Sequence, residues 1–134
     1  MILPITLIIA AAAGIINLWL AIRSLTVRVS DKVLFGDGGN PKMLRRMRAH
    51  ANFVEYTPFV LILMALLEYS GGSAELLKGS GIVYLLARVI HAFGIERPRF
   101  TMQLIGALGT WIVLLVLAIW AIWTGVHASM PTVH

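Results

Sequence analysis

The stretch RMRAHANFVEYTPFVLILMALLEY, from Arg46 to Tyr69, begins like a polar surface helix and ends like a membrane span. Its first half carries closely spaced polar and charged residues, namely Arg48, His50, Asn52, Glu55 and Tyr56. Placing a charged side chain in hydrocarbon costs about 2.5 to 3.5 kcal/mol on insertion scales, so such residues usually have a partner and a function. We therefore take this stretch as the center of a candidate site.

The composition of the whole chain is that of an integral membrane protein. Of 134 residues, 59% are hydrophobic and 13% are charged, and the mean hydropathy is +0.87. Soluble domains carry about 25% charged residues. A membrane helix needs about 20 apolar residues, and the predicted helices cover approximately residues 2–22, 47–69, 76–95 and 100–126. We expect an all-α fold, a single four-helix membrane domain over residues 1–134.

The basic residues are sorted toward one side of the predicted bundle. Ten of the eleven basic residues lie between the first and second spans or around the third-to-fourth turn, and Lys78 alone falls in the opposite loop. The positive-inside rule places the ten-residue side in the cytoplasm and both termini outside. Because each basic cluster lies beside a span, we expect membrane lipid or a small acidic ligand as partner, and no nucleic acid.

The polar residues of the second span share one helix face. At about 100° per residue, Arg48, Asn52, Glu55 and Tyr56 form a stripe about 100° wide, and His50 points nearly opposite. In the third span, Tyr84, Arg88 and His91 also share a face.

The two faces indicate either a ligand site or a structural network. Glu55 and Arg88 are the natural ion pair, at similar depth if the two helices are antiparallel. One interpretation is a buried network that only holds the helices together. The other is a site for an anionic ligand, because Arg48 and Arg88 give two guanidinium groups to one glutamate and guanidinium groups bind carboxylates.

Two segments resemble the signatures of a known family. RAHANFVEYTPF and YLLARVIHAFG resemble those of the MAPEG family, small four-helix membrane proteins in eicosanoid and glutathione metabolism that include the microsomal glutathione transferases. The second-helix pattern is matched by Arg48, His50, Asn52, Glu55 and Tyr56. The third-helix arginine and histidine are matched by Arg88 and His91. The resemblance covers about Arg48 to Gly106.

The resemblance implies a homotrimer with glutathione bound between subunits near the cytoplasmic face. The resemblance is to the bacterial-type branch, so we expect a bacterial inner membrane, where the charge distribution makes both termini periplasmic. Arg48 and Arg88 would bind the carboxylates of glutathione, and Glu55 its ammonium or an arginine. Asn52 would bind an amide and Tyr56 a carboxylate or amide. His91 belongs to the same set of expected glutathione contacts.

This chain contains no cysteine, so any thiol chemistry must come from a bound small molecule such as glutathione. Catalysis would require a cation or a hydrogen-bond donor near the glutathione thiol, because the thiolate is the reactive form. Catalytic relatives carry an arginine near the start of the fourth helix, which Arg99 matches best. Arg97 is a second candidate, and both fit equally well as positive-inside charges. The implied activity is glutathione transfer to hydrophobic electrophiles from the bilayer, with peroxidase activity as a further chemistry.

Several features limit this interpretation. The eicosanoid-synthesising branch has tyrosines where His91 and Ile95 stand, so its substrates do not carry over. The alternative is a non-catalytic protein of the same fold that binds glutathione or lipid, or that has a structural role. His127 and His134 have no third ligand nearby, so we expect no metal site.

Other residues are expected to serve the fold. The glycines of GDGGNP are expected to form a turn. The four tryptophans (Trp19, Trp111, Trp120 and Trp123) are expected to serve as belt or packing residues. The small pairs Ala10 with Gly14 and Gly106 with Thr110 are expected to permit close helix approach.

Overall fold

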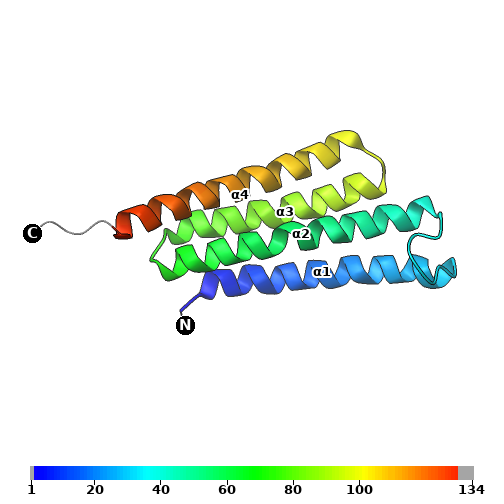
Figure 1. The fold of residues 1–134 in the computed structure, drawn as a ribbon, viewed down its shortest axis with the longest axis horizontal. Coiled ribbons are helices and arrows are strands. Elements are labelled where there is room, and N and C mark those ends of the chain that lie inside the picture. Colours follow the sequence, from blue (N-terminus) through cyan, green and yellow to red (C-terminus); the bar gives the residue numbers. More distant parts are fainter. Residues whose placement is uncertain (1, 130–134) are drawn as a thin grey trace, which may run out of the picture.

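The computed structural model describes residues 2–129, which form four long α-helices (Figure 1). Their bounds are α1 Pro4–Ser30, α2 Pro41–Tyr69, α3 Ala74–Glu96 and α4 Phe100–Ser129. Each helix is long and apolar enough to cross a membrane. The prediction of an all-α protein with four membrane helices is confirmed, and no strand occurs within residues 2–129.

Consecutive helices run antiparallel, so the chain passes up and down through the bundle (Figure 1). The described ends of α1 and α4 lie at one end of the molecule, together with the α2–α3 turn. The α1–α2 loop and the α3–α4 turn lie at the other end, which we call the basic end because Arg28, Lys42, Arg97 and Arg99 lie there. Helix α1 packs on α2 and α3, and α4 packs on α3 and α2.

The first two helices are longer than the predicted ranges 2–22 and 47–69. Helix α1 continues to Ser30 and α2 begins at Pro41, so the loop shrinks to residues 31–40. Hydropathy reports only the part of a helix that lies in hydrocarbon, whereas capping decides where the helix starts. Here the side chain of Asn40 accepts hydrogen bonds from the backbone N–H groups of Lys42 and Met43, at 2.9 and 3.2 Å.

The glycines of GDGGNP form a turn within the α1–α2 loop, as their pattern predicts. Gly38 and Gly39 have φ of +58° and +71°, a conformation that glycine adopts without steric cost. Asp31, at the start of the loop, accepts hydrogen bonds from the side chains of Ser30 and Asn40. These two bonds hold the pKa of the Asp31 carboxyl below its ordinary value.

The bundle is apolar both inside and outside. One group of buried apolar residues fills the center, namely Ile9, Val60, Met64, Leu67, Leu77, Tyr84, Val113 and Leu117. Large apolar side chains also cover the outer surface, and Ile8, Ile15 and Ile122 are each at least 67% exposed. In water such faces would favour association, but acyl chains solvate them without cost. The exposed faces therefore fit a hydrocarbon environment.

Two glycines bring α3 and α4 into close contact near the basic end. A Cβ atom on Gly106 would lie 2.5 Å from the Cβ of His91, and one on Gly94 would collide with the backbone of Gln103. The close approach predicted at Gly106 is thus present. Gly14, by contrast, has nothing within 4 Å of its Cβ position, so this chain by itself shows no close approach there.

A carboxylate fastens α2 to α1 at the opposite end of the bundle. The two oxygens of Glu68 accept hydrogen bonds from the backbone N–H groups of Ile5 and Thr6, at 2.8 and 2.7 Å. The first N–H groups of a helix have no partner within the helix and carry partial positive charge. Glu68 therefore caps the start of α1 across the bundle.

Candidate functional site

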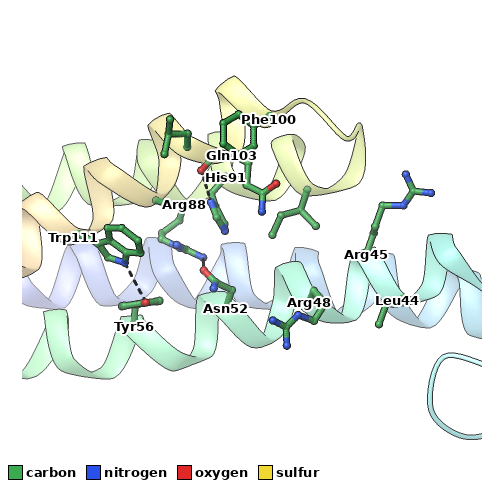
Figure 2. Close-up of a pocket in the computed structure, with 13 residues that line it drawn as sticks. Leu44, Arg45, Arg48, Asn52, Tyr56, Arg88, His91, Phe100, Gln103 and Trp111 are labelled. Carbon is green, nitrogen blue, oxygen red and sulfur yellow. Dashed lines mark hydrogen bonds between the residues drawn. The ribbon is translucent and has the colours of Figure 1, made fainter.

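A cavity of about 460 Å³ lies between α2, α3 and α4 toward the basic end (Figure 2). Its polar lining consists of Arg45, Arg48, Asn52, Tyr56, Arg88, His91 and Gln103. Its apolar lining consists of Leu44, Ile95, Phe100, Leu104, Ala107 and Trp111. The lining contains three arginines and no carboxylate, so the cavity is strongly positive.

Arg88 is the deepest polar group of this cavity. Its side chain is 1% exposed, and its Nη2 donates to Oδ1 of Asn52 at 2.7 Å. Its Nη1 donates to Oγ1 of Thr110 at 3.2 Å, and that hydroxyl donates in turn to the carbonyl oxygen of Gly106. The buried Nε of Arg88 has no acceptor within residues 2–129. Both acceptors are neutral, so no carboxylate bonds to this guanidinium.

The expected ion pair between Glu55 and Arg88 is wrong within this chain. Glu55 is exposed, and the salt bridges among residues 2–129 join Arg23 to Glu96 and Lys78 to Glu75. The reason is the rotation of α2 about its axis. Asn52 lies on the side of the polar stripe that faces α3, and Glu55 lies about 60° around the helix from it. Arg88 instead meets Asn52, which lies one helical turn from Glu55 and thus at nearly the predicted depth.

Tyr56 connects α2 to α4 across the cavity. The indole Nε1 of Trp111 donates to the hydroxyl oxygen of Tyr56 at 3.1 Å (Figure 2). The guanidinium carbon of Arg88 lies 5.8 Å from the centroid of the Tyr56 ring, within the range of a cation–π interaction. Since Tyr56 accepts from Trp111, its own hydroxyl proton remains available to a ligand.

His91 lines the cavity on the α3 side and is 5% exposed. Its Nδ1 lies 2.9 Å from the carbonyl oxygen of Gln103 on α4 (Figure 2). A carbonyl oxygen only accepts, so we assign the proton to Nδ1. Nε2 of the neutral ring is then an acceptor. The contact is possible because Gly106 allows α4 to approach the backbone of His91.

The remaining predicted site residues occupy different positions. Arg48 lines the cavity and is exposed. Arg99 is exposed in the α3–α4 turn and does not line the cavity, although the next residue, Phe100, does. Arg97 is also exposed outside it, with its guanidinium carbon 5.4 Å from the Phe93 ring centroid. The structure thus brings together Arg48, Asn52, Tyr56, Arg88 and His91, and leaves Glu55 and Arg99 outside.

Other polar side chains of α2 and α3 connect helices without lining the cavity. His50 points away from the cavity, as its helix position predicts, and its Nε2 lies 2.9 Å from Oδ1 of Asn17 on α1. Tyr84 is fully buried, and its hydroxyl lies 2.7 Å from that of Thr57. These contacts link α2 to α1 and to α3, as the structural interpretation of the polar faces proposes for membrane helices.

Sequence reasoning missed four residues that shape the site. Gln103 and Arg45 line the cavity, and Thr110 bonds to Arg88. Trp111 was expected only in a belt or packing role, yet it lines the cavity and bonds to Tyr56. A signal was present, because residues 103, 107 and 111 follow a four-residue spacing and so share one face of α4.

This fold and cavity define a small multi-pass membrane protein with a positively charged site between its helices. The model of the MAPEG family matches residues 6–123, so the chain belongs to the MAPEG family. It is similar to the inner membrane protein YecN of Escherichia coli strain K12, with 32% identity over 97 residues, which are 72% of this chain and 74% of YecN. The YecN of Escherichia coli O6:H1 strain CFT073 matches to the same extent. The family resemblance of the two motifs is confirmed.

Proposed function

We propose that this protein is an integral-membrane glutathione S-transferase that conjugates hydrophobic electrophiles drawn from the bilayer. The observation that supports this most directly is the buried guanidinium of Arg88, which has two neutral acceptors and an Nε without any acceptor, beside a cavity lined by no carboxylate. A buried cation without a bonded carboxylate is costly. An anionic ligand in the cavity would supply the missing charge.

Glutathione matches the donors and acceptors of the cavity. It carries two carboxylates, one ammonium and several amide groups. Arg48 and Arg88 are suited to its carboxylates because guanidinium groups form charge-assisted hydrogen bonds. Asn52 and the free hydroxyl proton of Tyr56 are suited to its amides, and Nε2 of neutral His91 can accept an N–H. Its thiol would be the reactive group.

Thiolate formation is the step that a transferase must favour. Each unit by which the pKa of a bound thiol falls requires about 1.4 kcal/mol of preferential stabilisation of the thiolate. We assign this role to Arg99, with Arg97 as the second candidate. Arg99 directly precedes Phe100, which lines the cavity, so the proposal places the thiol at the α3–α4 end of the site. Peroxidase activity would use the same thiolate.

The exposed position of Glu55 supports assembly into an oligomer, for which the family resemblance implies a homotrimer. It is exposed on a helix that spans the membrane, and a carboxylate facing acyl chains is unfavourable. A neighbouring subunit that covers this part of α2 would remove it from lipid. Glu55 could then bind the glutathione ammonium or an arginine at the subunit boundary. We place the trimer in a bacterial inner membrane, with the basic end cytoplasmic and both termini periplasmic.

The test is calorimetric titration of the purified protein with glutathione, followed by thiolate absorbance on mixing and turnover of a hydrophobic aryl halide. Binding, a thiolate signal and turnover together are the expected result. Failure to bind glutathione would refute the proposal.

A second candidate is a non-catalytic member of the family that binds glutathione or lipid, or that serves a structural role. The exposed positions of Arg97 and Arg99 outside the cavity favour it. Glutathione binding without a thiolate at any accessible pH would select this candidate.

A further inference from the structure

A second cavity, of about 350 Å³, lies at the basic end between the start of α2 and the end of α3. It is lined by Lys42, Arg45, Arg46, Glu96 and Arg97. Arg45 is the one residue that also lines the cavity described above. The two cavities are therefore neighbours that share only Arg45, and nothing in the proposed transferase uses Lys42 or Arg46.

The single carboxylate of this second cavity is already neutralised. One oxygen of Glu96 forms an ion pair with Arg23 of α1. The guanidinium of Arg23 also lies 4.7 Å from the Trp19 ring centroid and 5.3 Å from that of Phe93. Because the charge of Glu96 is neutralised by Arg23, the other four lining residues, which are all basic, give the cavity an excess of positive charge.

Most hydrogen-bond donors in this cavity have no acceptor in the described part of the chain. Arg45 donates through Nε to the carbonyl oxygen of Pro41 at 3.1 Å, and Arg46 donates through Nη1 to that of Arg23. Their other guanidinium nitrogens are free for a ligand. The Glu96 side chain is 9% exposed, and its Oε1 is buried without a hydrogen-bond donor in residues 2–129. A ligand that fits this cavity therefore carries an anionic group for the guanidinium groups and a hydroxyl group that can donate to Glu96.

The position of this cavity along the helices fits the level of lipid headgroups. Arg23, the ion-pair partner of Glu96, lies over the ring of Trp19, and tryptophan concentrates at membrane–water interfaces. The apolar part of α2 begins at Phe53. At 1.5 Å per residue, Arg46 lies about 10 Å from Phe53 along the helix axis, toward the basic end. Basic pockets between membrane helices at this level bind anionic headgroups. This position favours a phospholipid over a free anion.

We propose that this cavity binds an anionic phospholipid through its phosphate, with Lys42, Arg45, Arg46 and Arg97 around the phosphate oxygens. A headgroup hydroxyl, as in phosphatidylglycerol, donates to Oε1 of Glu96. The lipid would then bridge α2 and the α3–α4 turn, beside the first cavity. The proposal stands whether or not the protein is a glutathione transferase.

The experiment is a titration of the detergent-solubilised protein with phosphatidylglycerol and with phosphatidylcholine of the same acyl chains, followed by native mass spectrometry. We expect phosphatidylglycerol to bind at least about tenfold more tightly, the scale set by a few basic residues near an anionic headgroup. The double variant Lys42→Gln/Arg46→Gln should lose roughly 30-fold in that affinity, because each basic residue near the headgroups contributes about 1 kcal/mol. Lys42→Gln alone, which removes no side-chain hydrogen bond or ion pair of the described residues, should lose less in the same direction.

The matched control is Lys32→Gln/Lys78→Gln, which removes the same net charge outside this cavity. It should change phosphatidylglycerol affinity by no more than about twofold, because separated surface charges are screened. Equal affinity for the two lipids, or equal losses in the two double variants, would overturn the proposal. Inorganic phosphate that displaces the lipid at comparable concentration would show that the ligand is a soluble phosphate. A thermal melt of each variant identifies any that fails to fold.

Discussion

Replacing Asn52 with aspartate tests whether Arg88 is the anion-binding group. The two side chains have nearly the same shape, so Asn52→Asp places a carboxylate where the amide oxygen now lies, 2.7 Å from Nη2 of Arg88. Two charges about 4 Å apart attract by about 4 kcal/mol at an effective dielectric constant of about 20, before desolvation is subtracted. The new carboxylate would therefore neutralise Arg88 from within.

The expected result is a loss of glutathione affinity without a loss of fold. A charge-assisted hydrogen bond contributes about 1.5 to 3 kcal/mol, so binding should weaken roughly 10-fold to 150-fold. The melting temperature should change little, because the cost of burying the aspartate offsets most of its attraction to Arg88. Calorimetric titration and thermal melting in the same detergent measure both quantities.

Two further variants separate charge from lost contacts. Asn52→Ala removes the acceptor of Arg88 but adds no charge, so it should destabilise the fold by about 1 to 3 kcal/mol and weaken binding less than Asn52→Asp. Asn17→Asp adds the same charge beside His50, outside the cavity, and should leave affinity unchanged. If Asn52→Asp binds glutathione as well as the parent, Arg88 does not hold the ligand anion and the reasoning fails.

Four other outcomes follow from the structure. Glu68→Gln should lower the free energy of unfolding by about 1 to 3 kcal/mol, since the α1 cap loses its charge, and denaturant titration would measure it; an unchanged midpoint would count against the cap. Gly106→Val should separate α3 from α4, because its side chain would collide with His91, and should thereby abolish glutathione binding. A calorimetric titration with glutathione that gives the parent affinity would contradict this. Arg99→Ala should raise the pKa of the bound glutathione thiol and lower turnover with little change in glutathione affinity, whereas Arg97→Ala should change both quantities much less. If Arg99→Ala keeps the parent thiolate absorbance and rate, Arg99 is only a surface charge. The carboxyl of Asp31 has a lowered pKa, so its hydrogen bonds stabilise the α1–α2 loop at pH values above the ordinary aspartate pKa and are lost as the pH falls through the lowered pKa. Hydrogen exchange in residues 31–40 should therefore accelerate in that acidic range, and a rate of opening that does not depend on pH would refute this prediction.

The sequence alone determined the membrane class, the four helices, and the sides of α2 and α3 that carry polar groups. Hydropathy and helical spacing are local properties, and both are legible in a single segment. The motif around Arg48 and Arg88 also pointed to the family that the comparison shows. Helix ends were less accurate, because the polar extensions of α1 and α2 carry no hydropathy signal and depend on caps such as Asn40.

Only the tertiary structure decided which polar groups meet. The partner of Arg88 depends on the rotation of α2 and on its register against α3, and an error of one helical turn exchanges Asn52 for Glu55. The contributions of Thr110 and Trp111 depend on how closely α4 approaches α3, which the backbone contact at Gly106 sets. These are relations between helices, fixed by packing across the bundle, and no single segment contains them.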